Sequence, residues 1–195
     1  MKNNIKIEKF DILETNRSAM KDQKALCLWM TGLSGSGKTT LANALESELY
    51  RMGKHTYIID GDNLRNGLCS DLEFSEHDRK ENIRRAAELS RLMVDAGLIV
   101  IVSLISPYSL DREFARKLFK PNQFIEIYLS ASLNTCEKRD VKGLYKKARD
   151  GKLHNFTGID SPYEAPDEPE IIIDSGELSL GDSIKRIIKF LFNED

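Results

Sequence analysis

Two short segments hold the residue types that could do chemistry. The first, "GLSGSGKT" (32–39), fits the pattern G-x-x-x-x-G-K-[ST], with an apolar run before it and a helix-forming stretch after it. Glycines let such a loop wrap a phosphate chain with its N–H groups inward, and the helix N-terminus adds partial positive charge. Lys38 could then reach the β- and γ-phosphates, and the Thr39 hydroxyl could bind Mg²⁺. This segment, called the phosphate loop below, predicts a nucleoside triphosphate site rather than a flexible glycine-serine turn.

The second segment, "DGDNLR" (60–65), places two carboxylates after an apolar run. Asp60 and Asp62 flank a glycine, so both could face the nucleotide, one toward Mg²⁺ and one toward an acceptor hydroxyl. An ordinary Asp-Gly turn is the alternative. A GTPase would need the guanine-reading motif N-K-x-D, which is absent. A motor or ATPase usually has an aspartate at the end of a central apolar strand, but here the most apolar run ends in Ser103 and Ser106. The pattern favours a small-molecule kinase.

Basic and amide side chains follow closely. Arg65 ends the second segment, and Arg79 and Asn82 are spaced i, i+3 near the start of a helix expected from residue 76. Two cations, an amide and a helix dipole in one region suit an anionic acceptor, although surface arginines on a solvated face are the commoner explanation.

Two aromatic residues could complete the acceptor site. Phe74 lacks an apolar partner for a hydrophobic staple, because that position holds Arg79. Phe74 and Phe156 could therefore stack on a base, a contact worth about 1–3 kcal/mol per ring. Core packing is the alternative for both.

A basic segment and a proline-rich segment follow one another late in the chain. Six of the twelve residues 138–149 are Lys or Arg, and "FTGIDSPYEAP" (156–166) contains two prolines and a glycine that exclude a regular helix. We predict a lid at about 138–166 that closes over the transferring phosphate. A solvated charged face is the alternative for the basic run, and a spacer is the alternative for the proline-rich segment. Its last part, 156–166, is called the cap.

The elements that must position these residues alternate along the chain. Apolar runs predict strands at 25–31, 56–60, 98–105, 124–129 and 170–173, and helices are expected at 37–51, 76–96 and 179–192. We predict helix N-caps at Ser75, Asp111 and Ser132. Apolar strands alternating with helices indicate an α/β fold, a parallel sheet with helices on both faces.

The bulk composition excludes several classes of protein. The 195 residues are 41% hydrophobic, enough for one domain, and 29 basic residues balance 31 acidic ones, so no affinity for nucleic acid or membrane is expected. The three cysteines form no CxxC pair, the first residues do not resemble a signal peptide, and no apolar run reaches about 20 residues. A cytoplasmic location is predicted.

Together these segments resemble the adenylylsulfate kinase (APS kinase) family of P-loop kinases. The likeness extends from about residue 25 to 173 and is most specific in "CEKRDVKGLYKKARDGKLHNFTGIDSPYEAP" (136–166). It implies a P-loop kinase domain at 25–195 after an N-terminal arm at 1–24, and a homodimer. It also implies transfer of phosphate from ATP, with Mg²⁺, to the 3′-hydroxyl of adenosine 5′-phosphosulfate in sulfate assimilation.

The resemblance also implies roles for individual residues. Phe74 and Phe156 would hold the adenine, Asp62 would act on the 3′-hydroxyl, and Ser106 would be a phosphoserine intermediate or a hydrogen-bonding residue. The implied ATP site comprises Gly32, Leu33, Ser34, Gly35, Ser36, Gly37, Lys38, Thr39, Thr40 and Arg139. The implied acceptor site comprises Asp62, Arg65, Phe74, Arg79, Asn82, Ile105, Ser106, Lys142, Leu144 and Phe156. Asp62, Lys38 and Ser106 would be catalytic, and Thr39 and Asp62 would bind Mg²⁺.

Two positions depart from the family pattern. Glu73 stands where glycine is usual and could alter acceptor affinity, and Val141 stands where proline is usual and could loosen the lid. Two alternatives stay open: a P-loop kinase for another hydroxyl substrate, such as a sugar acid or another nucleotide, and a nucleotide-binding regulatory module without catalysis.

Overall fold

Five parallel strands form one sheet, and the confirmed fold class is the predicted α/β fold with helices on both faces. A computed structural model describes residues 6 and 8–192; the outermost parts of the predicted arm (1–5 and 7) and of the predicted domain (193–195) lie outside the described residues. The strands are β1 (Leu26–Thr31), β2 (Thr56–Asp60), β3 (Ile99–Ser103), β4 (Phe124–Leu129) and β5 (Ile171–Ile173). Their order is β2-β3-β1-β4-β5, so the strand before the phosphate loop is central.

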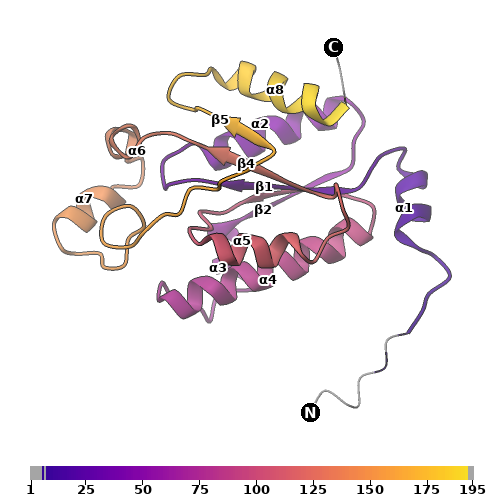
Figure 1. Cartoon of the computed structure of the whole chain (residues 1–195), viewed down its shortest axis with the longest axis horizontal. Coiled ribbons are helices and arrows are strands. Elements are labelled where there is room, and N and C mark those ends of the chain that lie inside the picture. Colours follow the sequence, from indigo (N-terminus) through magenta and orange to yellow (C-terminus); the bar gives the residue numbers. More distant parts are fainter. Residues whose placement is uncertain (1–5, 7, 193–195) are drawn as a thin grey trace.

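Helices cover both faces of the sheet (Figure 1), with α2 and α8 on one face and α3, α4 and α5 on the other. The helices of the described chain are α1 (Glu14–Met20), α2 (Lys38–Arg51), α3 (Gly61–Arg65), α4 (Glu76–Asp95), α5 (Ser109–Arg116), α6 (Leu133–Arg139), α7 (Leu144–Arg149) and α8 (Leu180–Phe192). All six residues of β1 are buried because side chains alternate between two cores. Leu28 and Met30 pack toward α2 and α8, whereas Cys27 and Trp29 pack toward α4 and α5.

Most of the predicted elements are confirmed to within about two residues. The N-caps at Ser75 and Ser132 are confirmed, because each hydroxyl accepts a hydrogen bond from the backbone N–H three residues later. The predicted helix N-cap at Asp111 is wrong: α5 begins at Ser109, and Asp111 lies in its first turn. The reason is a distant carboxylate, since Glu164 Oε2 accepts the Ser109 N–H at 2.7 Å and so satisfies the helix start from outside.

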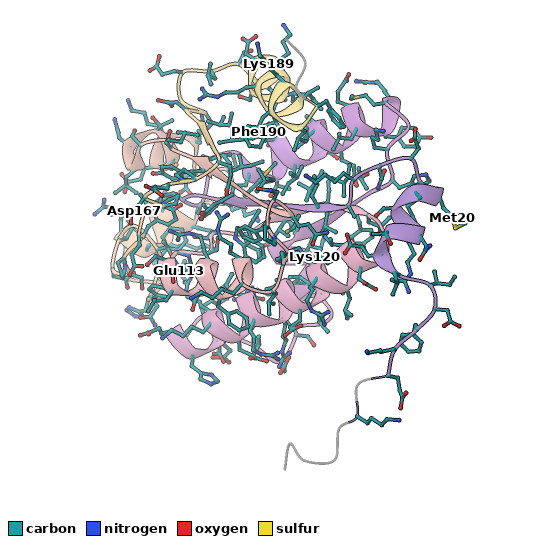
Figure 2. All side chains as sticks on the ribbon, turned by 45° about the vertical axis from the view of Figure 1, so that its right-hand side comes forward. Met20, Glu113, Lys120, Asp167, Lys189 and Phe190 are labelled. Atoms are coloured by element: carbon teal, nitrogen blue, oxygen red, sulfur yellow. The ribbon has the colours of Figure 1, made fainter. Side chains whose placement is uncertain are left out.

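The N-terminal arm contains α1, which the sequence analysis did not predict. Arg17 Nη1 donates to the Asp95 carboxylate at 2.8 Å, and the Gln23 amide donates to the carbonyl of Gly97 at 2.8 Å. Gly97 has a φ of +84°, and a Cβ there would lie 2.9 Å from the carbonyl carbon of Arg17. Met20 on α1 points away from the body of the protein (Figure 2).

The predicted lid and α6 share a small core that is separate from the two cores of the sheet. Cys136, Tyr145, Ala148 and Phe156 are buried together, and α6 and α7 lie at one end of the sheet while α1 lies at the other (Figure 1). In the described ranges, no helix combines the length and apolar character needed to cross a membrane.

Candidate active site

One large cavity lies where the strands end. Its volume is about 1120 Å³, and every predicted site residue lines it except Gly32 and Leu33. Parallel strands point their carboxyl ends at one edge of the sheet, so the loops that follow β1, β2 and β3 meet there. The lid segment forms another wall.

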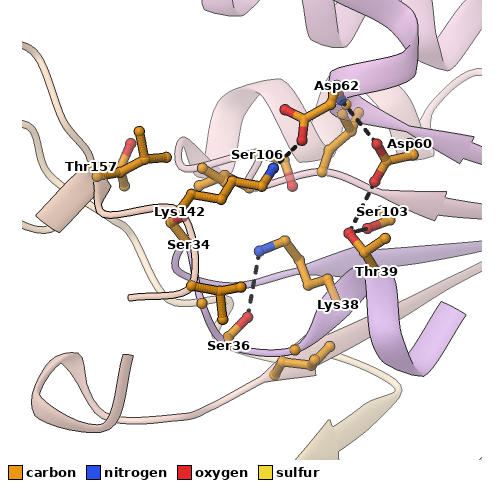
Figure 3. A pocket seen from close by; sticks show the side chains of 18 of the residues that line it. Ser34, Ser36, Lys38, Thr39, Asp60, Asp62, Ser103, Ser106, Lys142 and Thr157 are labelled. Atoms are coloured by element: carbon orange, nitrogen blue, oxygen red, sulfur yellow. Dashed lines mark hydrogen bonds and ion pairs between the residues drawn. The ribbon is translucent and has the colours of Figure 1, made fainter. Parts of the chain in front are cut away.

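The phosphate loop holds its own lysine. Lys38 Nζ donates to the carbonyl oxygens of Gly32 at 2.9 Å and Leu33 at 2.8 Å, and it also contacts Ser36 Oγ (Figure 3). Burial lowers the pKa of Lys38 to about 8. A buried ammonium held only by neutral oxygens gains much from an anionic ligand, so the amine is ready to exchange carbonyl contacts for phosphate oxygens.

The two carboxylates of "DGDNLR" do different things. Asp60 Oδ1 accepts the Asp62 N–H at 3.0 Å and caps α3, while Asp60 Oδ2 accepts from Thr39 Oγ1 at 3.0 Å. Thr39 Oγ1 also lies 3.2 Å from Ser103 Oγ. Asp62 is exposed and forms an ion pair with Lys142 of the lid (Figure 3). The carboxylate beside Thr39 is therefore that of Asp60, and Asp62 faces the lid.

Two arginines stand in the cavity without carboxylate partners in the part of the chain that the structure describes. Arg65 Nη1 donates to the backbone carbonyls of Leu72 and Glu73, at 3.0 and 2.8 Å. Arg79 donates to the carbonyl of Asn155 at 2.6 Å and to the cap. Burial lowers the pKa of both guanidinium groups. Neither guanidinium has a carboxylate within ion-pair distance among the described residues, which suits an anionic ligand.

The two candidate stacking rings differ in burial. Phe74 is 53% exposed, with the Arg65 guanidinium 4.4 Å from its ring centre, so it is not a core residue. Phe156 is 7% exposed and contacts the Tyr145 ring edge-on at 5.0 Å, so it packs in the lid core while one side lines the cavity.

Asn82 is a buried polar residue with a free acceptor. The side chain lies on α4 at the cavity wall, only 5% exposed. Its Oδ1 has no hydrogen-bond partner among the described residues. A buried carbonyl oxygen in this state costs free energy unless a ligand satisfies it.

Ser106 is held in an unusual backbone conformation. Its φ is +39°, a backbone angle that residues other than glycine rarely adopt, and the residue is 1% exposed. Ser106 Oγ accepts the Trp29 indole N–H at 3.1 Å, and the Ser106 carbonyl accepts from Arg112 at 2.8 Å. The geometry provides a fixed hydrogen-bonding hydroxyl.

Three further residues that line the cavity are absent from the predicted ATP and acceptor sites. Tyr145 donates its hydroxyl to the Ser34 carbonyl at 2.8 Å and so joins the lid to the phosphate loop. Ser103 Oγ lies beside Thr39 Oγ1, and Thr157 Oγ1 accepts a hydrogen bond from Arg79. Only Ser103 carried a signal, its place at a strand end; Tyr145 and Thr157 depend on contacts distant in sequence.

Comparisons with known proteins agree with one another. Residues 24–174 match the family model described as "Adenylylsulphate kinase". The adenylyl-sulfate kinase of Marinobacter nauticus is 54% identical over 92% of this chain and 90% of its own length. The Mycobacterium tuberculosis APS kinase, solved in complex with AMPPNP and APS, superposes with a TM-score of 0.83 at 42% identity, covering 86% of this chain and 98% of that one. A hexameric APS kinase from Thiobacillus denitrificans gives a TM-score of 0.67 at 26% identity, covering 92% of this chain and 31% of that one.

Proposed function

We propose, for a chain that belongs to the adenylylsulfate kinase family, that it transfers the γ-phosphoryl group of ATP to the 3′-hydroxyl of adenosine 5′-phosphosulfate. The observation that carries this proposal is that one cavity is lined by the phosphate loop, by two aromatic rings and by two arginines that have no carboxylate partner among the described residues. The alternative kinase, for a sugar acid, would not need the two stacking rings.

The donor nucleotide would bind along the phosphate loop. The ammonium group of Lys38 would leave the carbonyls of Gly32 and Leu33 and stabilise charge on the β- and γ-phosphates. Arg139 supports the same site from the lid side, where it donates to the Gly35 carbonyl at 3.3 Å.

The acceptor would lie between α4 and the lid. Its adenine would stack between Phe74 and Phe156, and Arg65 and Arg79 would hold its phosphosulfate. Asn82 Oδ1 would accept a hydrogen bond from bound adenosine 5′-phosphosulfate, which would supply a partner that none of the described residues provides.

Asp62 is our candidate for the residue that acts on the acceptor hydroxyl. Its carboxylate is exposed in the cavity and is bound by Lys142, a contact that must open for the acceptor to reach it. We propose that Asp62 then orients or deprotonates the 3′-hydroxyl, while Lys142 moves to the transferring phosphate. Ser106 serves by hydrogen bonding, because its hydroxyl is already held by the Trp29 indole.

The residues present fit a magnesium ion. Mg²⁺ in such sites takes one or two carboxylates and completes its shell with phosphate oxygens and water. Thr39 and Asp60, whose oxygens lie 3.0 Å apart, are the first candidates to hold it, and Asp62 is the second carboxylate. When bound, the ion would neutralise charge on the β- and γ-phosphates.

A coupled ADP-release assay tests the proposal. The protein is mixed with ATP and Mg²⁺, with and without adenosine 5′-phosphosulfate, and the product is identified by mass spectrometry. ADP release that requires the acceptor, with a product one phosphoryl group heavier at the 3′ position, is the expected result. Tight ATP binding without acceptor-dependent turnover would refute this choice of substrate.

We also propose that the protein is a cytoplasmic homodimer. Leu92 on α4 and Leu110 and Phe114 on the adjacent α5 are exposed apolar side chains, which support self-association. Cys27, Cys69 and Cys136 are free and buried, which supports a reducing compartment. Sedimentation over a range of protein concentrations distinguishes a dimer from a monomer or a larger ring.

A further inference from the structure

Arg112 is a buried cation that the mechanism above does not use. It lies on α5, is 3% exposed and does not line the cavity. Its guanidinium donates to three segments: Nε to Glu126 Oε1 on β4 at 2.7 Å, Nη1 to the Ser106 carbonyl at 2.8 Å, and Nη2 to the Glu164 carbonyl at 2.8 Å.

The segments that contain Ser106 and Glu164 form two walls of the proposed acceptor site. Residues 105–109 contain Ser106, and the cap at 156–166 contains Phe156. Other bonds join the same two segments: the Glu164 N–H donates to the Pro107 carbonyl at 2.9 Å, and the Ser109 hydroxyl donates to Glu164 Oε2 at 2.7 Å. Arg112 therefore lies at the centre of the contact between residues 105–109 and the cap, which is called the seam below.

Arginine is the residue that this seam requires. A guanidinium presents five N–H donors in a fixed plane and can serve three directions at once, whereas a lysine ammonium on a flexible stem cannot reproduce that fork. Glu126, itself 7% exposed, compensates the buried charge and fixes the plane. The positive φ of Ser106 is costly and persists only where the surroundings hold it, as Arg112 does through the Ser106 carbonyl.

We propose that Arg112 is a positioning residue that locks the 105–109 segment to the cap. Through this lock Ser106 and Phe156 keep one geometry around the acceptor nucleotide. This inference rests on the proposed function for its kinetic consequence, but not for its structural one.

The neighbouring Arg116 provides a matched control. It lies one turn further along α5 and also contacts Glu126, at 3.2 Å, but its other partners are Glu170 and the Phe124 carbonyl, and it reaches neither Ser106 nor the cap. Arg112→Lys and Arg116→Lys therefore make the same chemical change beside the same glutamate. Only the first breaks the seam.

Hydrogen exchange of the full chain tests the lock without any substrate. In Arg112→Lys, the amides of 105–109 and 157–164 should exchange faster by on the order of tenfold, while those of β1 and α2 stay unchanged. Arg116→Lys should leave both segments protected. Unchanged protection in Arg112→Lys, or equal loss in the two variants, would overturn the proposal.

Kinetics supply the second readout. With wild-type activity on adenosine 5′-phosphosulfate established first, Arg112→Lys should lower kcat/KM for the acceptor by about tenfold or more, because small displacements of a substrate wall are costly. The Kd of an ATP analogue should change by less than about twofold. Equal loss of ATP and acceptor binding would mean a general folding defect and would count against the lock.

A third variant keeps the test decisive if Arg112→Lys does not fold. The Glu164 side chain is exposed, so Glu164→Ala leaves the buried pair intact while removing both bonds to Ser109. It should raise exchange in the same two segments, by less than Arg112→Lys. No change there would contradict a seam. If wild type fails to use the acceptor but exchange behaves as expected, the substrate assignment falls and the lock stands.

Discussion

Replacing Asn82 by leucine should stabilise the free protein and weaken acceptor binding at the same time. Asn82 is buried and its Oδ1 has no partner among the described residues, so the free protein carries the desolvation cost of an unpaired acceptor. Leucine has the same number of side-chain heavy atoms and no polar atoms, and the open cavity beside it leaves room for the two methyl groups that replace the amide oxygen and nitrogen.

The size of each effect follows from that cost. An unsatisfied buried acceptor costs about 1–3 kcal/mol, so its removal should raise the free energy of unfolding by roughly 1 kcal/mol or more. For a chain of this length, 1 kcal/mol corresponds to a rise in Tm of about 2–4 °C. Bound adenosine 5′-phosphosulfate loses one hydrogen bond in a desolvated site, which is also worth about 1–3 kcal/mol. The Kd of this substrate should therefore rise roughly 5- to 150-fold.

Thermal unfolding of the free protein and calorimetric titration with adenosine 5′-phosphosulfate measure the two effects. Asn43→Leu on the exposed face of α2 is the control and should change neither. A lower Tm in Asn82→Leu with unchanged acceptor affinity would refute the reasoning, because Asn82 would then be a structural residue and not one that awaits a ligand.

Four further outcomes are expected at single residues. Asp62→Asn should reduce turnover about 10²-fold while ATP still binds, and a near-normal rate would remove Asp62 from the chemistry. Ser106→Ala should retain substantial transfer, because its hydroxyl serves as a hydrogen-bond acceptor for an indole; complete loss with an intact fold would revive the phosphoserine. Phe156→Ala should weaken acceptor binding more than ATP binding, measured by titration with each nucleotide, and equal losses would indicate damage to the lid core. Raising the pH should weaken ATP binding through Lys38: below its pKa of about 8 the amine is already charged, whereas above it binding must take up a proton, so the Kd should rise about tenfold between pH 7 and pH 9. A flat profile would show that the triphosphate does not depend on this charge.

The sheet and the phosphate loop could be predicted because their causes are local. A strand such as β1 is apolar on both faces wherever it crosses the middle of a covered sheet, and this leaves a continuous run in the sequence. The glycines of the phosphate loop are required by backbone angles, as at Gly35 with a φ of +75° and Gly37 with +96°. Neither feature depends on the rest of the chain.

What could not be predicted depends on partners distant in sequence. The start of α5 is satisfied by Glu164, 55 residues away, and no local pattern reveals this. The roles of Asp60 and Asp62 were both open, because only the fold places Thr39 beside one and Lys142 beside the other. The same limit applies to Tyr145, whose hydroxyl reaches Ser34 across 111 residues.

The contact between α1 and Gly97 has a consequence for where this protein can be shortened. The family match begins at residue 24, yet Arg17 leaves no space for a side chain at Gly97, and Gln23 binds the same turn. We therefore expect the cooperative unfolding unit to extend upstream to α1, beyond the residues that the family model matches. A chain cut at residue 24 would expose the turn between α4 and β3, and this turn leads directly into the strand that ends at Ser103 beside Thr39. Removal of α1 would thus perturb the nucleotide site at the opposite end of the sheet through the single strand β3.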